Sequence, residues 1–175
     1  MNVPLKYHQM YADVSEISYA TAGSACADVR AYFGVKERLF TVYKKDGATV
    51  TYVAFSEQGE PIHTVLEPLD RALIPTGIIL DIPEGYSVRI HPRSGMAIKF
   101  GLTLCNCEGI IDSDYVQQLY IPVINLSGKN ITISHNERIA QLELVQNIRA
   151  SLMGGCPRPN LKTTREGGFG STGVV

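Results

Sequence analysis

The chain has 175 residues, of which 45% are hydrophobic and 19% charged, and its formal net charge is -1. This length suits one domain with its own core and is too short for two ordinary domains. The near-zero charge argues against a general nucleic-acid binder, which would carry a basic stripe, so any nucleotide ligand should be small. Residues 1–11 lack a signal-peptide pattern and no apolar run reaches about 18 residues, so we expect a cytoplasmic protein, in the host cytoplasm if the chain is viral.

Short β-branched and aromatic runs separated by turn residues recur along the chain, which predicts an all-β sandwich or barrel. The clearest pair is residues 40–43 and 50–53, which alternate apolar and polar residues around Asp46-Gly47, a strong hairpin signal. Pro122 within a later run predicts a sheet edge or a β-bulge. The later strands are expected at residues 78–80, 86–90, 119–124 and 139–145.

One short helix is expected at Ser94–Phe100. Pro92 precedes it, Ser94 is the candidate N-cap and Gly101 the terminating glycine. Because the first N–H groups of a helix favour an anion, this end is a candidate phosphate contact.

The cysteines Cys26, Cys105, Cys107 and Cys156 are expected to be reduced, since no secretory signal accompanies them. On a strand, Cys105 and Cys107 would face the same side and behave as small buried hydrophobes. They lack the spacing of a structural zinc site, and the histidines are scattered without ligand spacing. We therefore expect no zinc site.

Most of the polar chemistry lies in three distant segments, residues 91–95, 109–115 and 167–173. The first supplies a guanidinium and a hydroxyl, and the second a carboxylate beside an aromatic ring. The third is a glycine-rich run whose N–H groups could surround an anion. Together they indicate a triphosphate site.

From Gly154 onward, glycine and proline replace the apolar pattern. Residues 1–153 are therefore predicted to form the β domain, and residues 154–175 a linker and a glycine-rich arm. The alternative is that the arm is a disordered tail without a binding role, but Phe169 favours a lid that stacks on a planar base.

Five segments in order resemble the motifs of the trimeric deoxyuridine triphosphatase (dUTPase) family, over nearly the whole chain. They are residues 25–29, 92–95, 106–115 and 137–141 and the glycine-rich arm. The resemblance implies a jelly-roll-like all-β subunit, a homotrimer with three active sites shared between subunits, and Mg²⁺-dependent hydrolysis of dUTP to dUMP and pyrophosphate.

The resemblance also implies individual roles. Asp112 would be the general base that activates water for attack on the α-phosphorus. Asp28 would bind Mg²⁺ through water. Asn106 would read the edge of uracil, and Tyr115 would pack beneath the deoxyribose and exclude ribonucleotides. The other expected substrate contacts are the hairpin residues Gly109 and Ile111, the phosphate and water contacts Arg93, Ser94, Gly95 and Gln141, and the arm residues Arg165, Phe169, Gly170, Ser171 and Thr172.

Structural alternatives accompany these roles. Asp112 in isolation would be a turn-forming aspartate, and Ser94 could serve only as a helix cap. Asp114 could contact the site or only solvate a strand end. Arg138 is expected to brace neighbouring strands or subunits, with a surface pair to Glu137 or Glu143 as the alternative.

The chain departs from the family pattern at three places. Cys26 stands where glycine is usual, and the arm is one residue short, so either Arg165 or Thr164 takes the place of its arginine. Residues 35–67 exceed the usual length and predict an inserted hairpin. That hairpin would be decorative or would form a surface for a regulatory protein partner.

Two other functions stay open. A dCTP-deaminase-related enzyme would share the fold but would place a glutamate near the base. A nucleotide-sensing module would keep the site as a switch and bind a protein through residues 35–67.

Overall fold

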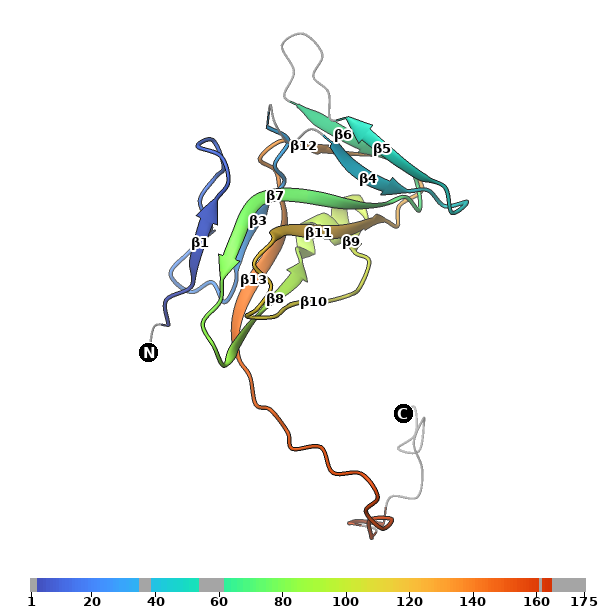
Figure 1. Cartoon of the computed structure of the whole chain (residues 1–175). Coiled ribbons are helices and arrows are strands. Elements are labelled where there is room, and N and C mark those ends of the chain that lie inside the picture. Colours follow the sequence, from blue (N-terminus) through green and yellow to red (C-terminus); the bar gives the residue numbers. More distant parts are fainter. Residues whose placement is uncertain (1–2, 35–38, 54–61, 161, 165–175) are drawn as a thin grey trace.

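The computed structural model describes residues 3–34, 39–53, 62–160 and 162–164, which are mostly β-strand with one short helix (Figure 1). The strands are β1 Lys6–Gln9, β2 Ser18–Tyr19, β3 Ala27–Arg30, β4 Leu39–Tyr43, β5 Thr49–Val53, β6 His63–Leu66, β7 Arg71–Asp81, β8 Tyr86–Pro92, β9 Leu102–Leu104, β10 Gly109–Ile111, β11 Gln118–Asn125, β12 Ile131–Ser134 and β13 Arg138–Gln146, and the helix is α1 Ser94–Phe100. Within this part of the chain, no helix is long and apolar enough to cross a membrane.

Two antiparallel sheets make up the body. The larger sheet has the order β5-β4-β7-β11-β9 with β1 also paired to β7, and the smaller has the order β10-β8-β13-β3-β2. Strands β6 and β12 form a separate pair. Apolar side chains from both sheets, such as Ile74 and Ile121 of the larger and Val88 and Leu142 of the smaller, enter one core. The predicted all-β fold is confirmed, and the arrangement is jelly-roll-like.

The hairpin predicted around Asp46-Gly47 is confirmed. Strands β4 and β5 pair in register, with Tyr43 opposite Thr49. The Asp46 side chain accepts a hydrogen bond of 3.0 Å from the Ala48 N–H, and Gly47 has a φ of +89°, which glycine adopts without strain. Strand β4 also pairs with β7, so the hairpin extends the larger sheet. Residues 35–38 and 54–61 of the predicted insertion lie outside the described residues.

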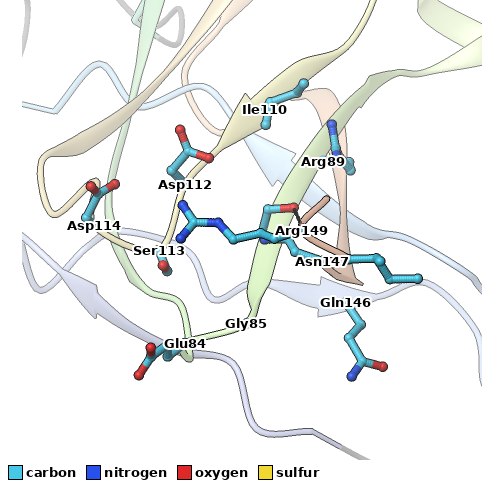
Figure 2. Close-up of a pocket in the computed structure, with 12 residues that line it drawn as sticks. Glu84, Gly85, Arg89, Ile110, Asp112, Ser113, Asp114, Gln146, Asn147 and Arg149 are labelled. Carbon is cyan, nitrogen blue, oxygen red and sulfur yellow. Dashed lines mark hydrogen bonds between the residues drawn. The ribbon is translucent and has the colours of Figure 1, made fainter. Parts of the chain in front are cut away.

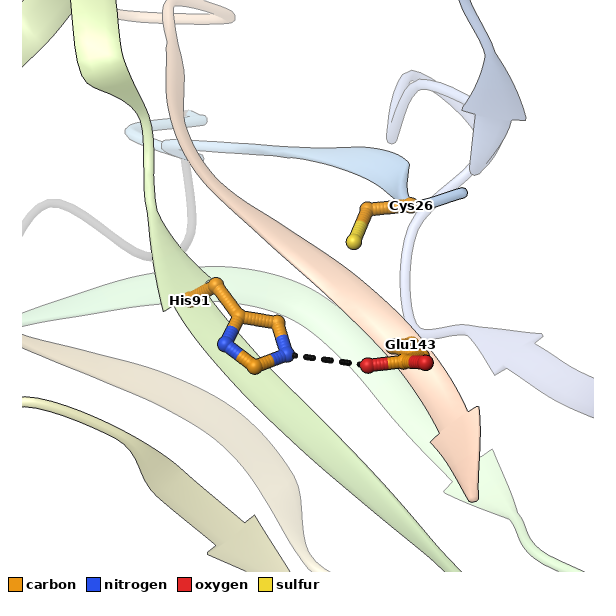
Figure 3. Close-up of side chains that lie close together, drawn as sticks. All are labelled: Cys26, His91 and Glu143. Carbon is orange, nitrogen blue, oxygen red and sulfur yellow. Dashed lines mark hydrogen bonds and ion pairs between the residues drawn. The ribbon is translucent and has the colours of Figure 1, made fainter. Parts of the chain in front are cut away.

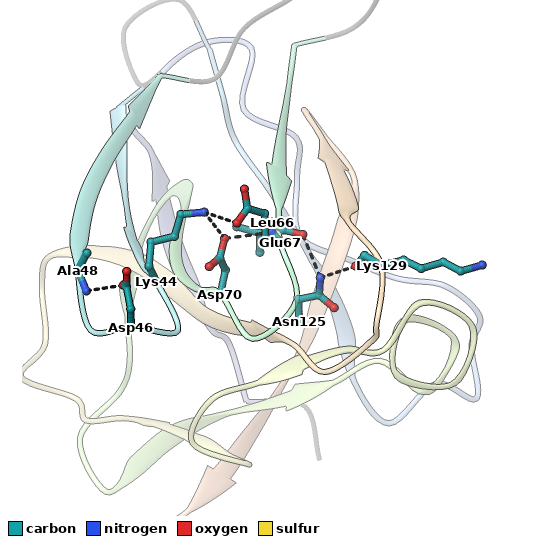
Figure 4. A network of polar contacts seen from close by, with 8 residues as sticks. All are labelled: Lys44, Asp46, Ala48, Leu66, Glu67, Asp70, Asn125 and Lys129. Atoms are coloured by element: carbon teal, nitrogen blue, oxygen red, sulfur yellow. Dashed lines mark hydrogen bonds and ion pairs between the residues drawn. The ribbon is translucent and has the colours of Figure 1, made fainter.

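A buried ion pair connects this hairpin to the turn before β7 (Figure 4). The Lys44 ammonium lies 2.8 Å from Asp70 and 3.1 Å from Glu67. The Asp70 side chain is only 2% exposed, and the same oxygen accepts the Glu67 N–H. Beside it, Asn125 donates to the carbonyls of Leu66 and Lys129. The buried Asp70 and Asn125 side chains thus both have hydrogen-bond or ion-pair partners, which limits the desolvation cost of burying them.

The predicted helix is confirmed, but its predicted cap is wrong. Arg93, not Ser94, is the N-cap residue, and it forms no side-chain capping bond. Ser94 is the first helical residue. Gly101 ends the helix as predicted, with a φ of +74° and its N–H donating to the Ala97 carbonyl.

Pro122 is neither at a sheet edge nor at a bulge, contrary to the prediction. It pairs with Leu73 in a strand that lies between β7 and β9, and the register shift lies between Gln118 and Tyr120. The Pro122 carbonyl accepts the Cys105 N–H just past the end of β9. In an antiparallel strand, the backbone nitrogen and carbonyl of one residue point toward the same neighbouring strand. The Pro122 nitrogen therefore points toward the end of β9, and the N–H that proline lacks falls where the pairing between β9 and β11 ends.

All four cysteines are free, as predicted. The predicted burial of Cys105 and Cys107 is wrong, because β9 ends at Leu104 and both residues lie exposed in the following turn. Cys107 has a φ of +60° there. Because the chain turns directly after Leu104, the strand does not extend to the two cysteines and does not bury their side chains.

Candidate active site

Three predicted motif segments meet at one cavity of about 420 Å³, which we call the arginine cavity. Strand β13 pairs with β3 on one side and β8 on the other, and Gln141 therefore lies opposite both Asp28 and His91. Helix α1 starts directly after β8 and adds its first residues. The cavity is lined by Asp28, Arg93, Ser94, Gly95 and Gln141, with Ala20, Ser24, Ala25, Cys26 and Arg138.

The charged side chains of the arginine cavity form ion pairs with one another. One Asp28 oxygen lies 2.9 Å from Arg93 Nε and the other 3.0 Å from Arg138 Nη1. Arg93 also donates to the Arg138 carbonyl at 3.0 Å. Two guanidiniums around one carboxylate leave an excess of positive charge, which favours a polyanion. The predicted bracing by Arg138 is confirmed between β3 and β13, with Asp28 as its partner.

Gln141 and the first residues of α1 supply further polar groups to this cavity. Gln141 donates its amide N–H to the Pro92 carbonyl at 2.9 Å, which fixes the amide between β13 and β8. The Ala97 N–H bonds the Arg93 carbonyl, so the N–H groups of Ser94 and Gly95 precede the first helical hydrogen bond. Such groups can donate to phosphate oxygens.

A second cavity of about 290 Å³, here called the hairpin cavity, lies under the segment that runs from Asn106 into β10. A side chain at Gly109 would place its Cβ 3.1 Å from Ile90 Cβ, so glycine lets the segment pack closely on β8. The Tyr115 hydroxyl donates to the Gln118 carbonyl at 2.9 Å, which holds the ring. The lining is Asn106, Gly109, Ile110, Ile111 and Tyr115 with Leu73, Ile90, Leu119, Tyr120 and Pro122. Its small volume and mainly apolar wall suit a single planar ring.

Asp112 comes directly after β10 and lines a third cavity of about 810 Å³, here called the acidic cavity (Figure 2). The Asp112 carbonyl accepts the Tyr115 N–H at 3.1 Å, and this turn leaves the side chain exposed. Ile110 belongs to the walls of both the hairpin and the acidic cavities, so Asp112 lies beside the hairpin cavity. Figure 2 shows Asp114 on the same wall and Arg149 extending toward Asp112.

Sequence reasoning missed the two arginines of the acidic cavity. Arg89 alternates on β8 with buried Val88 and Ile90, so strand alternation could have assigned it to the polar face. Arg149 follows the last strand in an irregular segment and carries no such signal.

The arginine cavity has no lining residue in common with the hairpin or acidic cavity, within the part of the chain that the structure describes. The predicted site residues therefore form two groups, one with Asp28 and Arg93 and one with Asn106 and Asp112. The predicted arm contacts Arg165, Phe169, Gly170, Ser171 and Thr172 lie outside the described residues.

Comparison with known proteins decides the family. The dUTPase family profile matches residues 60–173. The chain belongs to the dUTPase family. The deoxyuridine 5'-triphosphate nucleotidohydrolase of Finegoldia magna is 49% identical over 110 residues, which cover 62% of this chain and 75% of that relative. The enzyme of the same name from Desulfotalea psychrophila is 42% identical over 134 residues, 75% of this chain and 85% of the relative.

Solved dUTPase structures share the fold of this dUTPase. The Staphylococcus bacteriophage 80alpha dUTPase with dUPNHPP has a TM-score of 0.73 and 22% identity, covering 99% of this chain and 100% of that one. A mutant of the dUTPase from S. aureus phage phi11, described with a structural Mg(II) ion, has a TM-score of 0.65 and 18% identity, covering 92% and 100%. At these identities the likeness concerns the fold.

Proposed function

We propose that this dUTPase uses Asp112 as the general base for hydrolysis of dUTP. Family membership gives the reaction: the chain is a dUTP diphosphatase that converts dUTP to dUMP. The observation that carries the mechanism is the exposed Asp112 carboxylate at the end of β10, beside a small cavity suited to one planar ring.

The hairpin cavity would hold the nucleoside. The Asn106 amide and the backbone around Gly109 and Ile111 would pair with the edge of uracil, since amides offer both donors and acceptors. Tyr115, fixed through its hydroxyl, would lie beneath the deoxyribose and leave no room for a 2'-hydroxyl. Phe169 and Gly170 of the arm would then close over the base.

The arginine cavity would hold the phosphates. Arg93 supplies guanidinium donors, and Ser94 and Gly95 supply N–H groups at the start of α1. Gln141 would orient the attacking water or a phosphate oxygen. Ser171, Thr172 and either Arg165 or Thr164 of the arm would reach the γ-phosphate.

In the chemical step, the Asp112 carboxylate would take a proton from water as the water oxygen bonds to the α-phosphorus. The bond from that phosphorus to the bridging oxygen breaks, and the electron pair leaves with pyrophosphate. The water oxygen remains on dUMP. A positioned base of this kind contributes about 10²- to 10⁴-fold in rate.

The arginine cavity also fits Mg²⁺ held chiefly by the triphosphate. Mg²⁺ in such sites keeps several waters and needs only one or two carboxylates besides substrate phosphates. Each Asp28 oxygen is paired with a guanidinium, but a carboxylate has about four acceptor positions and can still accept from metal-bound water. Bound Mg²⁺ would neutralise the triphosphate and stabilise the leaving pyrophosphate.

We further propose that the site is completed in a homotrimer. The arginine cavity and the hairpin cavity are lined by separate groups of residues, so a neighbouring subunit would bring them together. Past Gln146 the chain runs away from the sheets (Figure 1), and Ile148 and Leu152 there are 98% and 93% exposed. Such apolar side chains gain stability if they pack on another subunit, which would carry the predicted linker and arm of residues 154–175 to a neighbouring site.

The test is product analysis with a substrate panel. The purified full chain is incubated with Mg²⁺ and dUTP, dCTP, dTTP or UTP, and the products are separated. We expect dUMP and pyrophosphate from dUTP, and little turnover of the others. Formation of dUTP from dCTP would instead indicate a deaminase, and binding of dUTP without turnover would indicate a sensor.

A further inference from the structure

Three side chains with metal-binding atoms converge on the smaller sheet (Figure 3). The Cys26 sulfur, a His91 ring nitrogen and a Glu143 carboxylate oxygen all lie within 4.8 Å of one another, and each residue is half-buried. His91 Nε2 and Glu143 Oε2 are 3.3 Å apart. None of the three has a role in the proposed hydrolysis.

Sheet register explains why these residues meet. Strand β13 lies between β8 and β3, with Gln141 opposite His91 and Leu142 opposite Ala27. Glu143 therefore lies diagonally from His91 and beside Cys26, which directly precedes β3. The intervening residues Ile90, Leu142 and Ala27 are buried in the core, so the three ligands face the opposite side of the sheet.

We infer that Cys26, His91 and Glu143 form a binding site for a divalent transition metal such as Zn²⁺. Ligand atoms around a tetrahedral Zn²⁺ stand about 3.3 to 3.7 Å apart, so small rotamer shifts bring this cluster to that geometry. A thiolate and an imidazole select zinc-like metals over Mg²⁺, which prefers oxygen ligands. Three protein ligands leave a fourth position for water.

A second carboxylate supports the orientation of the histidine. Glu108 Oε1 lies 3.6 Å from His91 Nδ1, on the other side of the ring from Glu143, and Arg89 lies 3.4 Å from Glu108. A carboxylate beside the second nitrogen is the usual neighbour of a metal-bound histidine, because it orients the ring and increases its basicity. With Glu108 beside Nδ1, the other ring nitrogen, Nε2, faces Glu143.

Binding would proceed with loss of one proton. Burial raises the pKa of the Cys26 thiol, and the Glu143 carboxylate raises it further, so the metal-free thiol is protonated at neutral pH. The metal–sulfur bond replaces the S–H bond, and the proton goes to solvent. Glu143 and His91 bind through lone pairs, and no redox step is involved.

The expectation of no zinc site is revised by this proposal. It rested on the spacing of Cys105 and Cys107 and on the scatter of the histidines in the sequence. Strand pairing, which sequence spacing does not reveal, brings Cys26 to His91. A metal there would link β3, β8 and β13, the strands that also support the arginine cavity.

Cobalt is the probe for this site. The full chain is stripped of metal with a chelator and titrated with Co²⁺, and the thiolate-to-cobalt absorption band is followed. We expect one Co²⁺ per chain, displaced by Zn²⁺ and not by excess Mg²⁺, and a higher melting temperature in the bound form. Cys26→Ser should abolish the band, and His91→Gln or Glu143→Gln should weaken Co²⁺ binding at least about tenfold.

The matched controls are Cys156→Ser and His8→Gln, which alter an exposed cysteine and an exposed histidine elsewhere. Both should keep the band. Circular dichroism establishes that each variant is folded, and Glu143→Gln keeps the test decisive if a cysteine or histidine variant unfolds. The proposal is overturned if the wild-type chain gives no thiolate band, if the band persists in folded Cys26→Ser, or if folded His91→Gln and Glu143→Gln bind Co²⁺ as tightly as the wild type.

Discussion

The arginine cavity and the hairpin cavity are built in different ways. In the first, the register of three strands brings Asp28 between Arg93 and Arg138, and charge pairs hold the groups in place. In the second, close packing of Gly109 on Ile90 shapes a small and mainly apolar space. In the proposed function, the first would bind the phosphates of any nucleotide, whereas the second would select among bases and sugars. Because each has its own lining residues, we assign binding strength and selectivity to separate parts of the fold.

The largest expected effect concerns Asp112, the proposed general base beside the hairpin cavity. Asp112→Asn keeps the shape of the side chain but cannot accept a proton, so kcat for dUTP should fall about 10²- to 10⁴-fold with little change in KM. Pyrophosphate release measures the rate. Asp114→Asn removes the same charge from the same cavity wall and should change kcat only a few-fold. Equal losses in the two variants would assign the effect to charge and contradict a base at Asp112.

Arg93→Lys tests the arginine cavity. A lysine cannot both pair with Asp28 and bind phosphate through a planar fork, so kcat/KM should fall about 10- to 100-fold for dUTP. Arg30→Lys is the control, because Arg30 lies on β3 and donates to the Asn136 carbonyl outside the cavity. Steady-state kinetics on both variants measures kcat/KM for dUTP. Unchanged kcat/KM in Arg93→Lys would remove this residue from substrate binding.

Tyr115→Ala tests selectivity in the hairpin cavity. Removing the ring should open space for a 2'-hydroxyl and lower the ratio of kcat/KM for dUTP over UTP about tenfold, which corresponds to about 1.4 kcal/mol. Tyr115→Phe keeps the ring and loses only the bond to the Gln118 carbonyl, so it should retain most of the preference. A preference that survives in the alanine variant would exclude this ring as the selective element.

The smallest effect concerns the stability of the fold at His135 and depends on pH. His135 Nδ1 accepts the Phe33 N–H at 3.0 Å, and burial lowers the pKa of His135, with Asp13 partly opposing the shift. The unfolded chain therefore binds this proton more readily. The stabilising contribution is complete above about pH 6.5 and is lost as the pH falls below it toward the folded pKa.

Urea unfolding from neutral pH down to about pH 5 measures this contribution. His135→Gln should flatten the loss of stability in that range, whereas His8→Gln should follow the wild-type curve. Identical curves for wild type and His135→Gln would assign the pH dependence to other groups.

Local signals predicted the fold well. Asp46-Gly47 between alternating runs gave the hairpin, and Gly101 gave the end of the helix, because each depends on backbone preferences within a few residues. The cap at Ser94 and the edge at Pro122 were wrong, because the positions of Arg93 and of the end of β9 depend on tertiary pairing.

In the candidate site, too, the features that depend on strand pairing could not be predicted. Family motifs named Asp28, Arg93 and Gln141, and the structure brings them to one cavity. The pair from Asp28 to Arg138 and the approach of Cys26 to His91 depend on register between strands distant in sequence. A single sequence carries no direct signal for that register, so these contacts could only be found in the folded chain.

Subunit complementation tests most directly whether the two cavities of one site come from different subunits. Asp112→Asn and Arg93→Ala are each expected to be nearly inactive, and the two variants are co-expressed in equal amounts and purified together. In randomly mixed trimers, about a quarter of the sites would combine an intact Asp112 from one subunit with an intact Arg93 from another. We predict that the mixture recovers about that fraction of wild-type activity. Activity no higher than that of the separate variants would contradict a site shared between subunits.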